Sequence, residues 1–101
     1  MNQDQTRPPL RVALVQFKPS KGRVRDNIDR VRAIVEEHSS AVDVVVFPEA
    51  CLSGYFLEGG VTEAAVTIDR LTELLGPVPE DAPDLVIGFY ERWRRRLYNS
   101  V

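Results

Sequence analysis

The chain has 101 residues, a formal net charge of −2, 44% hydrophobic and 28% charged residues, which suits one soluble globular domain or part of one. This charge gives no general attraction to nucleic acid or to an anionic membrane. No apolar run approaches the ~20 residues that span a bilayer, and the single cysteine, Cys51, fits a reducing, cytoplasmic setting.

The first half of the chain predicts a strand, a helix and a second strand. Residues 1–9 are polar and end in two prolines, which indicates a disordered tail. Residues 10–17 (LRVALVQF) are almost continuously apolar, as is typical of a strand covered on both faces. Residues 24–39 carry apolar side chains at helical spacing. Residues 42–47 (VDVVVF) predict a second buried strand.

The second half repeats the alternation. A glycine-containing loop is predicted over residues 48–60, and one helix over residues 61–75, where a Gly-Pro step ends it. Residues 84–90 (DLVIGFY) predict a third buried strand, residues 91–96 a turn, and residues 97–101 the beginning of a fourth strand.

The predicted order β-α-β-α-β-β indicates an α/β fold with a mostly parallel sheet and right-handed crossovers. Three or four strands with two helices make a thin sheet with an open edge. Val101 falls inside a predicted strand. We therefore expect residues 10–101 to be the N-terminal part of a larger, truncated domain. The alternative is a small complete domain whose last strand lies at the sheet edge.

Glu49 is the first candidate for chemistry. It follows Pro48 at the C-terminal end of an apolar strand, where open α/β sheets build their sites. Surroundings poor in water would raise the proton affinity of its carboxylate towards that of a useful general base. The plainer interpretation is a surface carboxylate in a loop beside a proline.

The motifs of the chain, taken together, resemble those of the nitrilase superfamily of carbon–nitrogen hydrolases. They are, in order, LRVALVQF, a helix containing Asn27, VDVVVFPEACLSGY, DLVIGFYER and RLYNSV. The step FPE followed by LSGY is the most specific of them. The resemblance covers nearly all of residues 10–101.

The resemblance implies an α-β-β-α sandwich and a Glu-Lys-Cys catalytic set. In that family the cysteine attacks an amide, carbamoyl or nitrile carbon, the glutamate takes the thiol proton and later activates water, and the lysine stabilises the developing negative charge. Glu49 matches the glutamate by position. The implied partners are a small-molecule amide or nitrile substrate and, for the intact protein, further copies of itself, with no cofactor, metal, nucleic acid or membrane.

The other two catalytic groups of the family have no match in these 101 residues. Lys18 and Lys21 precede the glutamate motif, and Cys51 lies only two residues after Glu49. We expect Cys51 to be a small residue packed behind the loop, and the chain alone to lack hydrolase activity. The alternatives are a non-catalytic α/β binding or interaction module, and an unrelated doubly wound domain that binds a ligand at its strand ends.

Further candidates carry two interpretations each. Tyr55 suits either a substrate pocket or packing of the loop, while Phe56 and Leu57 suit a pocket or contacts to a larger domain. Asn99 could orient site groups, although a cross-strand hydrogen bond is the plainer interpretation.

Two features near the third predicted strand favour structural roles. Glu91 is either a second site carboxylate or, as we expect, a salt-bridged turn residue. Trp93 and its neighbouring arginines favour a charged hairpin tip or a subunit contact over a nucleic-acid patch.

Overall fold

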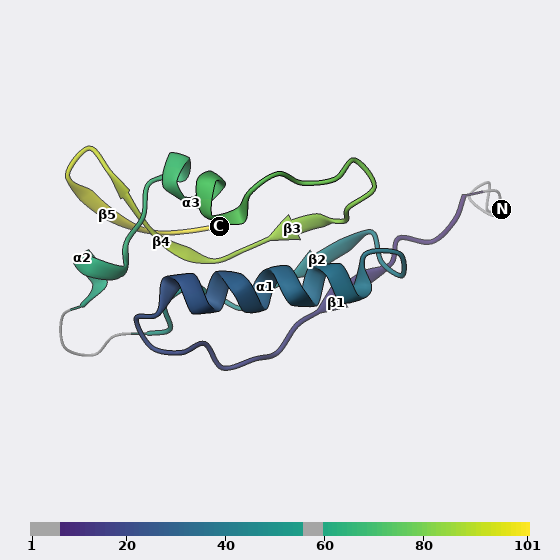
Figure 1. The fold of residues 1–101 in the computed structure, drawn as a ribbon, viewed down its shortest axis with the longest axis horizontal. Coiled ribbons are helices and arrows are strands. Elements are labelled where there is room, and N and C mark those ends of the chain that lie inside the picture. Colours follow the sequence, from purple (N-terminus) through teal and green to yellow (C-terminus); the bar gives the residue numbers. More distant parts are fainter. Residues whose placement is uncertain (1–6, 56–59) are drawn as a thin grey trace, which may run out of the picture.

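The computed structural model describes residues 7–55 and 60–101, and its centre is a parallel three-stranded sheet. The strands lie side by side in the order β1 (Val12–Leu14), β2 (Val44–Val46) and β3 (Asp84–Val86). Each is three residues long, shorter than the sequence predicts. Strands and helices alternate along the chain (Figure 1), so the α/β prediction is confirmed.

Helices connect the parallel strands. α1 (Val24–His38) joins β1 to β2 and ends one residue before its predicted end. α2 (Val61–Ala64) and α3 (Ile68–Leu75) join β2 to β3. α1 contacts α3, as expected when two successive crossovers of the same hand place their helices on one face of a sheet. No helix in the described part of the chain is long and apolar enough to cross a bilayer.

The hydrophobic core lies between this sheet and its helices. It consists of buried apolar side chains from α1, from β2 and the loop after it, from Val66, and from the segment that leads from β3 into β4: Ile28, Val31, Val45, Phe47, Cys51, Leu52, Val66, Ile87 and Phe89. Leu71, Leu74 and Leu75 of α3 pack against this cluster.

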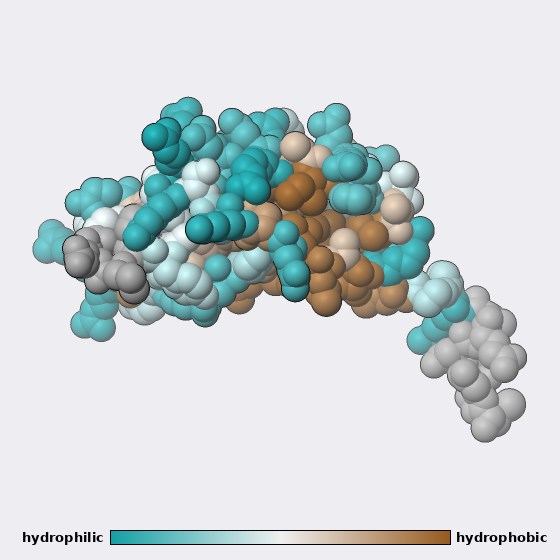
Figure 2. Space-filling model, turned by 90° about the horizontal axis from the view of Figure 1, so that it is seen from below, coloured by the Kyte–Doolittle hydropathy of each residue, from teal (hydrophilic) through white to brown (hydrophobic). Residues whose placement is uncertain are grey.

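The other face of the sheet is open. Val12 is 46% exposed and Leu14 is 77% exposed. Figure 2, a view from below, shows hydrophobic surface gathered in the part of the molecule that β1 occupies. The prediction that β1 is covered on both faces is therefore wrong for the described chain, because its helices pack on one face.

The predicted helix over residues 61–75 is broken in the middle. Val66 leaves the helix and forms a parallel bridge to Glu91. Its N–H donates to the carbonyl of Tyr90 at 3.0 Å, and its carbonyl accepts from the N–H of Arg92 at 2.9 Å. Thr67 then caps α3, with its hydroxyl accepting from the Arg70 N–H at 3.1 Å. The predicted end at Gly76 is confirmed, with φ at 73°.

The predicted strand over residues 84–90 divides between two sheets. β3 ends at Val86, and β4 (Phe89–Trp93) pairs antiparallel with β5 (Arg96–Ser100). Gly88 lies at the change of direction. A Cβ there would lie 2.8 Å from the Ala50 nitrogen and 2.9 Å from the Glu49 Cα. Only glycine lets this segment pass so close to the loop after β2.

The tip of the β4–β5 hairpin is a two-residue turn. Arg94 and Arg95 have φ of 49° and 65°, the signs that a type I′ turn requires. The predicted turn over residues 91–96 is therefore too long, since β4 continues to Trp93. The Arg94 guanidinium lies 4.4 Å from the centre of the Trp93 ring. Trp93 and the arginines after it therefore form a charged hairpin tip, as the sequence predicts.

Replacing Val66 by proline tests how the hairpin is attached. Val66→Pro removes the N–H that donates to Tyr90, so we expect the free energy of unfolding to fall by about 1–3 kcal/mol. Hydrogen exchange should accelerate in β4 and β5 more than in β1 and β2. Val66→Ala keeps the N–H and is the control, because its loss of packing should not selectively expose the hairpin amides. Equal exchange changes in both variants would contradict the attachment.

Candidate active site

Glu49 lies in the turn that follows the C-terminal end of β2, close to the strand end where the sequence predicts it. The strand end is anchored by buried Phe47, whose N–H donates to the Val86 carbonyl at 2.9 Å. Directly after Glu49, Ala50 adopts a left-handed φ of 52°, and the Gly54 N–H donates to the Ala50 carbonyl at 2.8 Å. The turn leaves Glu49 exposed while Ala50 and Cys51 are fully buried.

Both carboxylate oxygens of Glu49 are held by hydrogen bonds. The Tyr55 hydroxyl donates to Oε1 at 2.5 Å, and the Asn99 side-chain amide donates to Oε2 at 2.8 Å. Tyr55 comes from the same loop, whereas Asn99 comes from β5. The plainer interpretation of Asn99 as a cross-strand hydrogen bonder is wrong. The signal in the sequence was that the motif RLYNSV, which contains Asn99, falls in the order of motifs on which the family resemblance rests.

The hydrogen bonds to Glu49 shift the pKa values of Glu49 and Tyr55 in opposite directions. The hydrogen bond from Tyr55, followed by that from Asn99, lowers the pKa of Glu49 below its usual value, and a smaller loss of hydration opposes this. The same bond to Glu49 raises the pKa of Tyr55. The expectation of water-poor surroundings with a raised proton affinity is therefore wrong. Glu49 is an exposed carboxylate at neutral pH, and Tyr55 stays protonated.

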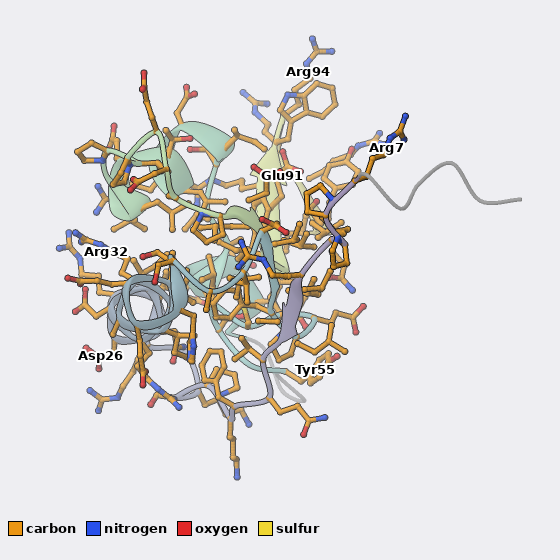
Figure 3. All side chains as sticks on the ribbon, turned by 90° about the vertical axis from the view of Figure 1, so that its right-hand side faces the viewer. Arg7, Asp26, Arg32, Tyr55, Glu91 and Arg94 are labelled. Atoms are coloured by element: carbon orange, nitrogen blue, oxygen red, sulfur yellow. The ribbon has the colours of Figure 1, made fainter. Side chains whose placement is uncertain are left out.

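A cleft of about 810 Å³ opens beside this pair. Its lining residues come from the segment after β1 and from the loop after β2: Gln16, Phe17, Lys18, Pro19, Lys21, Pro48, Glu49, Gly54 and Tyr55. The volume falls within the range of small-molecule sites. Figure 3 shows Tyr55 and Arg94 at opposite edges of the molecule, so the arginine-rich hairpin tip lies far from the cleft.

One buried amide ties together the two segments that line the cleft. Asn27 of α1 is fully buried, and its Nδ2 donates to the carbonyls of Ser20 and Leu52, both at 2.8 Å. Its Oδ1 accepts from the Ser20 N–H at 2.8 Å. In addition, the Gly22 N–H donates to the Ser53 carbonyl at 2.8 Å. The cleft walls are thus fixed to α1 and to each other.

Cys51 lies in the core, as predicted for a packing residue. Burial raises the pKa of its thiol to about 11, although hydrogen bonds from the backbone, first from Gly88, act in the other direction. The thiol is therefore protonated at neutral pH. Within residues 7–55 and 60–101, no three His, Cys, Asp or Glu side chains are grouped so that they could hold a metal ion.

Two further candidates have simple outcomes. Glu91 lies within β4, so the prediction that it is a turn residue is wrong, and it accepts a hydrogen bond from the Ser100 hydroxyl at 2.8 Å. Phe56 and Leu57 lie outside the described residues.

Replacing Asn27 tests the amide that ties the two segments. Asn27→Leu has a similar volume but leaves the Ser20 N–H and the carbonyls of Ser20 and Leu52 without this partner. We expect the free energy of unfolding to fall by about 2–4 kcal/mol in urea denaturation. The control, Asp29→Leu, changes an exposed position of the same helix, and its effect should stay within about 0.5 kcal/mol. Equal losses in both variants would contradict the role of Asn27.

Removing the Tyr55 hydroxyl tests the cause of the low Glu49 pKa. In Tyr55→Phe the pKa of Glu49 should rise towards its usual value, as measured by NMR titration of the side-chain carboxyl carbon. Tyr98→Phe removes an exposed hydroxyl from β5 and should leave this pKa unchanged.

The same variant has a pH-dependent effect on stability. Because the pKa of Glu49 is lowered on folding, the contribution of the contact is present above the unfolded-state pKa and is lost as the pH falls through the folded-state pKa. The stability difference between wild type and Tyr55→Phe should therefore shrink in acid. A difference that grew in acid would contradict the assignment.

Three curated relatives match parts of this chain. The protein N-terminal amidase of Schizosaccharomyces pombe is 43% identical over 49 residues, which are 46% of this chain and 17% of the relative. The glutamine-dependent NAD(+) synthetase of Xylella fastidiosa is 37% identical over 70 residues, 61% of this chain and 13% of the relative. That of Mycobacterium leprae is 31% identical over 96 residues, 91% of this chain and 14% of the relative. The chain thus matches less than a fifth of each relative's length.

A family-level match spans the described secondary structure. The sequence profile described as carbon–nitrogen hydrolase matches residues 11–101, from just before β1 through β5. It includes Glu49 and both of its hydrogen-bond donors. With most of its length matched, the chain belongs to the carbon–nitrogen hydrolase family.

Proposed function

We propose that Glu49 is the general base of a hydrolase that cleaves a non-peptide carbon–nitrogen bond with a Glu-Lys-Cys set. The observation that carries this proposal is the fixed carboxylate: Tyr55 and Asn99 each hold one of its oxygens at the edge of a cleft large enough for a small molecule. Geometry of this kind supports proton transfer because the acceptor is already oriented.

The proposed reaction uses Glu49 twice. Glu49 takes the proton of the nucleophilic thiol, which attacks the substrate carbon, while a lysine stabilises the oxyanion. Glu49 then returns the proton to the leaving ammonia, and in the second half it activates the water that cleaves the thioester. In this proposal, both the lysine and the cysteine are supplied by polypeptide other than these 101 residues. None of these steps needs a cofactor or a metal ion.

The lowered pKa fits this role in one respect and constrains it in another. It keeps Glu49 ionised, and therefore able to accept a proton, at neutral pH. It also makes an exposed Glu49 a weak base. A carboxylate has about four acceptor positions, so two remain for the thiol and the water. Closure of the site by further polypeptide and by substrate would remove water and raise the pKa into a useful range.

The relatives favour an amide as the substrate. One is named as an amidase, and two are named as dependent on glutamine, which carries a carboxamide. We therefore propose hydrolysis of a carboxamide with release of ammonia, ahead of a carbamoyl or nitrile substrate.

Replacing Glu49 by glutamine tests the proposal in the natural polypeptide that contains this chain. Glu49→Gln keeps the size of the side chain and removes the base, so kcat for ammonia release should fall by about 10²–10⁴-fold while circular dichroism stays native. Glu80→Gln removes an exposed carboxylate that does not line the cleft and is the control. Near wild-type activity in Glu49→Gln would refute the assignment. Amide binding without ammonia release in the wild type would favour the binding-module alternative.

A further inference from the structure

Two exposed segments of the chain carry opposite charges. Residues 92–98 (RWRRRLY), here called the arginine tip, form the end of the β4–β5 hairpin. Residues 77–83 (PVPEDAP), here called the acidic loop, join α3 to β3. Figure 1 shows the arginine tip at the left and the acidic loop at the right, both along the upper edge of the molecule. The tip therefore does not contact the loop of its own chain.

The charges of both segments are available to a partner. Five of their charged side chains take part in no salt bridge or hydrogen bond within residues 7–55 and 60–101: Arg92, Arg95, Arg96, Glu80 and Asp81. All five residues are exposed. Arginine binds carboxylates well because its planar guanidinium can donate two parallel hydrogen bonds to them.

The arginine tip also exposes aromatic surface. Trp93 is 51% exposed and Tyr98 is 38% exposed, and their ring centres lie 6.3 Å apart, so the two rings form one surface. The four cations of the tip are all arginines. Tryptophan, tyrosine and arginine are enriched at the centres of protein–protein interfaces, whereas lysine is depleted there. The composition of the tip is therefore that of a protein-binding surface.

Both segments have a defined shape before they meet a partner. Arg94 and Arg95 form the two-residue turn, and the Arg94 guanidinium packs over the Trp93 ring. Three of the seven residues of the acidic loop are prolines, whose φ is fixed, and the Ala82 N–H donates to the Pro79 carbonyl at 3.1 Å. Association of such segments loses less conformational entropy than association of flexible ones.

We propose that the arginine tip docks on the acidic loop of a second copy of this chain. The arginines pair with Glu80 and Asp81, while Trp93 packs on the prolines and on Val78, which is 60% exposed. Aromatic side chains bind proline-rich segments in the same way in other proteins. This interaction surface goes beyond the proposed hydrolase and does not depend on it.

The arrangement of the two segments suits a pair of copies. Because the tip and the loop lie at opposite ends of one edge, two antiparallel copies make the contact twice, as in a dimer with two-fold symmetry. A second copy is favoured over a nucleic acid or an anionic membrane. The whole chain has a net charge of −2, and the acidic loop on the same edge would repel phosphate groups.

Reversing the charges on one side of the contact tests the proposal in the natural polypeptide that contains this chain. Arg95→Glu/Arg96→Glu and Glu80→Arg/Asp81→Arg each turn attraction into repulsion. The dissociation constant for self-association, measured by sedimentation equilibrium at low salt, should rise at least about tenfold in each variant. High salt should weaken the association of the wild type.

Combining the four substitutions in one chain is the sharper test. The combined variant has the wild-type net charge and again places opposite charges on the tip and the loop, so its dissociation constant should return to within about threefold of the wild-type value. Arg23→Glu/Arg25→Glu is the control. It changes the net charge as much as the tip variant does, at exposed positions near the start of α1, and should alter the constant by less than about twofold. Native circular dichroism checks folding.

Each other outcome overturns the proposal. A wild type that stays monomeric at about 100 μM has no such contact, even where its tip binds heparin or anionic vesicles. Association that neither reversal weakens uses another surface. Weakening in both reversals without recovery in the combined variant excludes direct pairing of the two segments. Ammonia release is a separate measurement, so failure of this contact leaves the role of Glu49 standing.

Discussion

The three hydrogen bonds of the Asn27 amide are the interaction on which the site depends. A carboxamide both donates and accepts, so one side chain can satisfy the Ser20 N–H, the Ser20 carbonyl and the Leu52 carbonyl together. These groups belong to the two loops that line the cleft. Because Asn27 and Leu52 are buried, a loop that moved away would leave polar groups unpaired in the core. The position of α1 therefore sets the shape of the cleft.

The carboxylate at the rim depends on a second, long-range arrangement. Glu49 and Asn99 are 50 residues apart, and they meet because the chain changes sheets at Gly88 and then forms the β4–β5 hairpin. The bridge at Val66 attaches this hairpin to the segment between the helices. The geometry of the candidate base thus combines a local turn with a strand from the second sheet. The orientation of the Glu49 carboxylate therefore depends on both parts.

The sequence predicts well what local patterns determine. The spacing of apolar residues gives α1, the Gly76 stop ends α3 as expected, and the apolar run before Glu49 places this residue at a strand end. It fails where tertiary contacts decide. Val66 sits in a helical pattern but gains two backbone bonds to β4 by leaving it. The sequence also does not predict the direction in which the pKa of Glu49 shifts, because the folded loop and hairpin fix the positions of its hydrogen-bond donors.

Ala50 restricts which amino-acid substitutions the loop after β2 can tolerate. Its left-handed backbone disfavours most side chains by about 1–2 kcal/mol, its own methyl group is fully buried, and Gly88 is pressed against its nitrogen. Glycine would fit the backbone but leave a hole, asparagine would bring a polar amide into the core, and larger apolar groups would collide. A library of variants at Ala50 and Gly88 should therefore retain few functional members. Substitutions are easier to accommodate at exposed positions of the other cleft wall, such as Lys18, which does not contact Ala50 or Gly88.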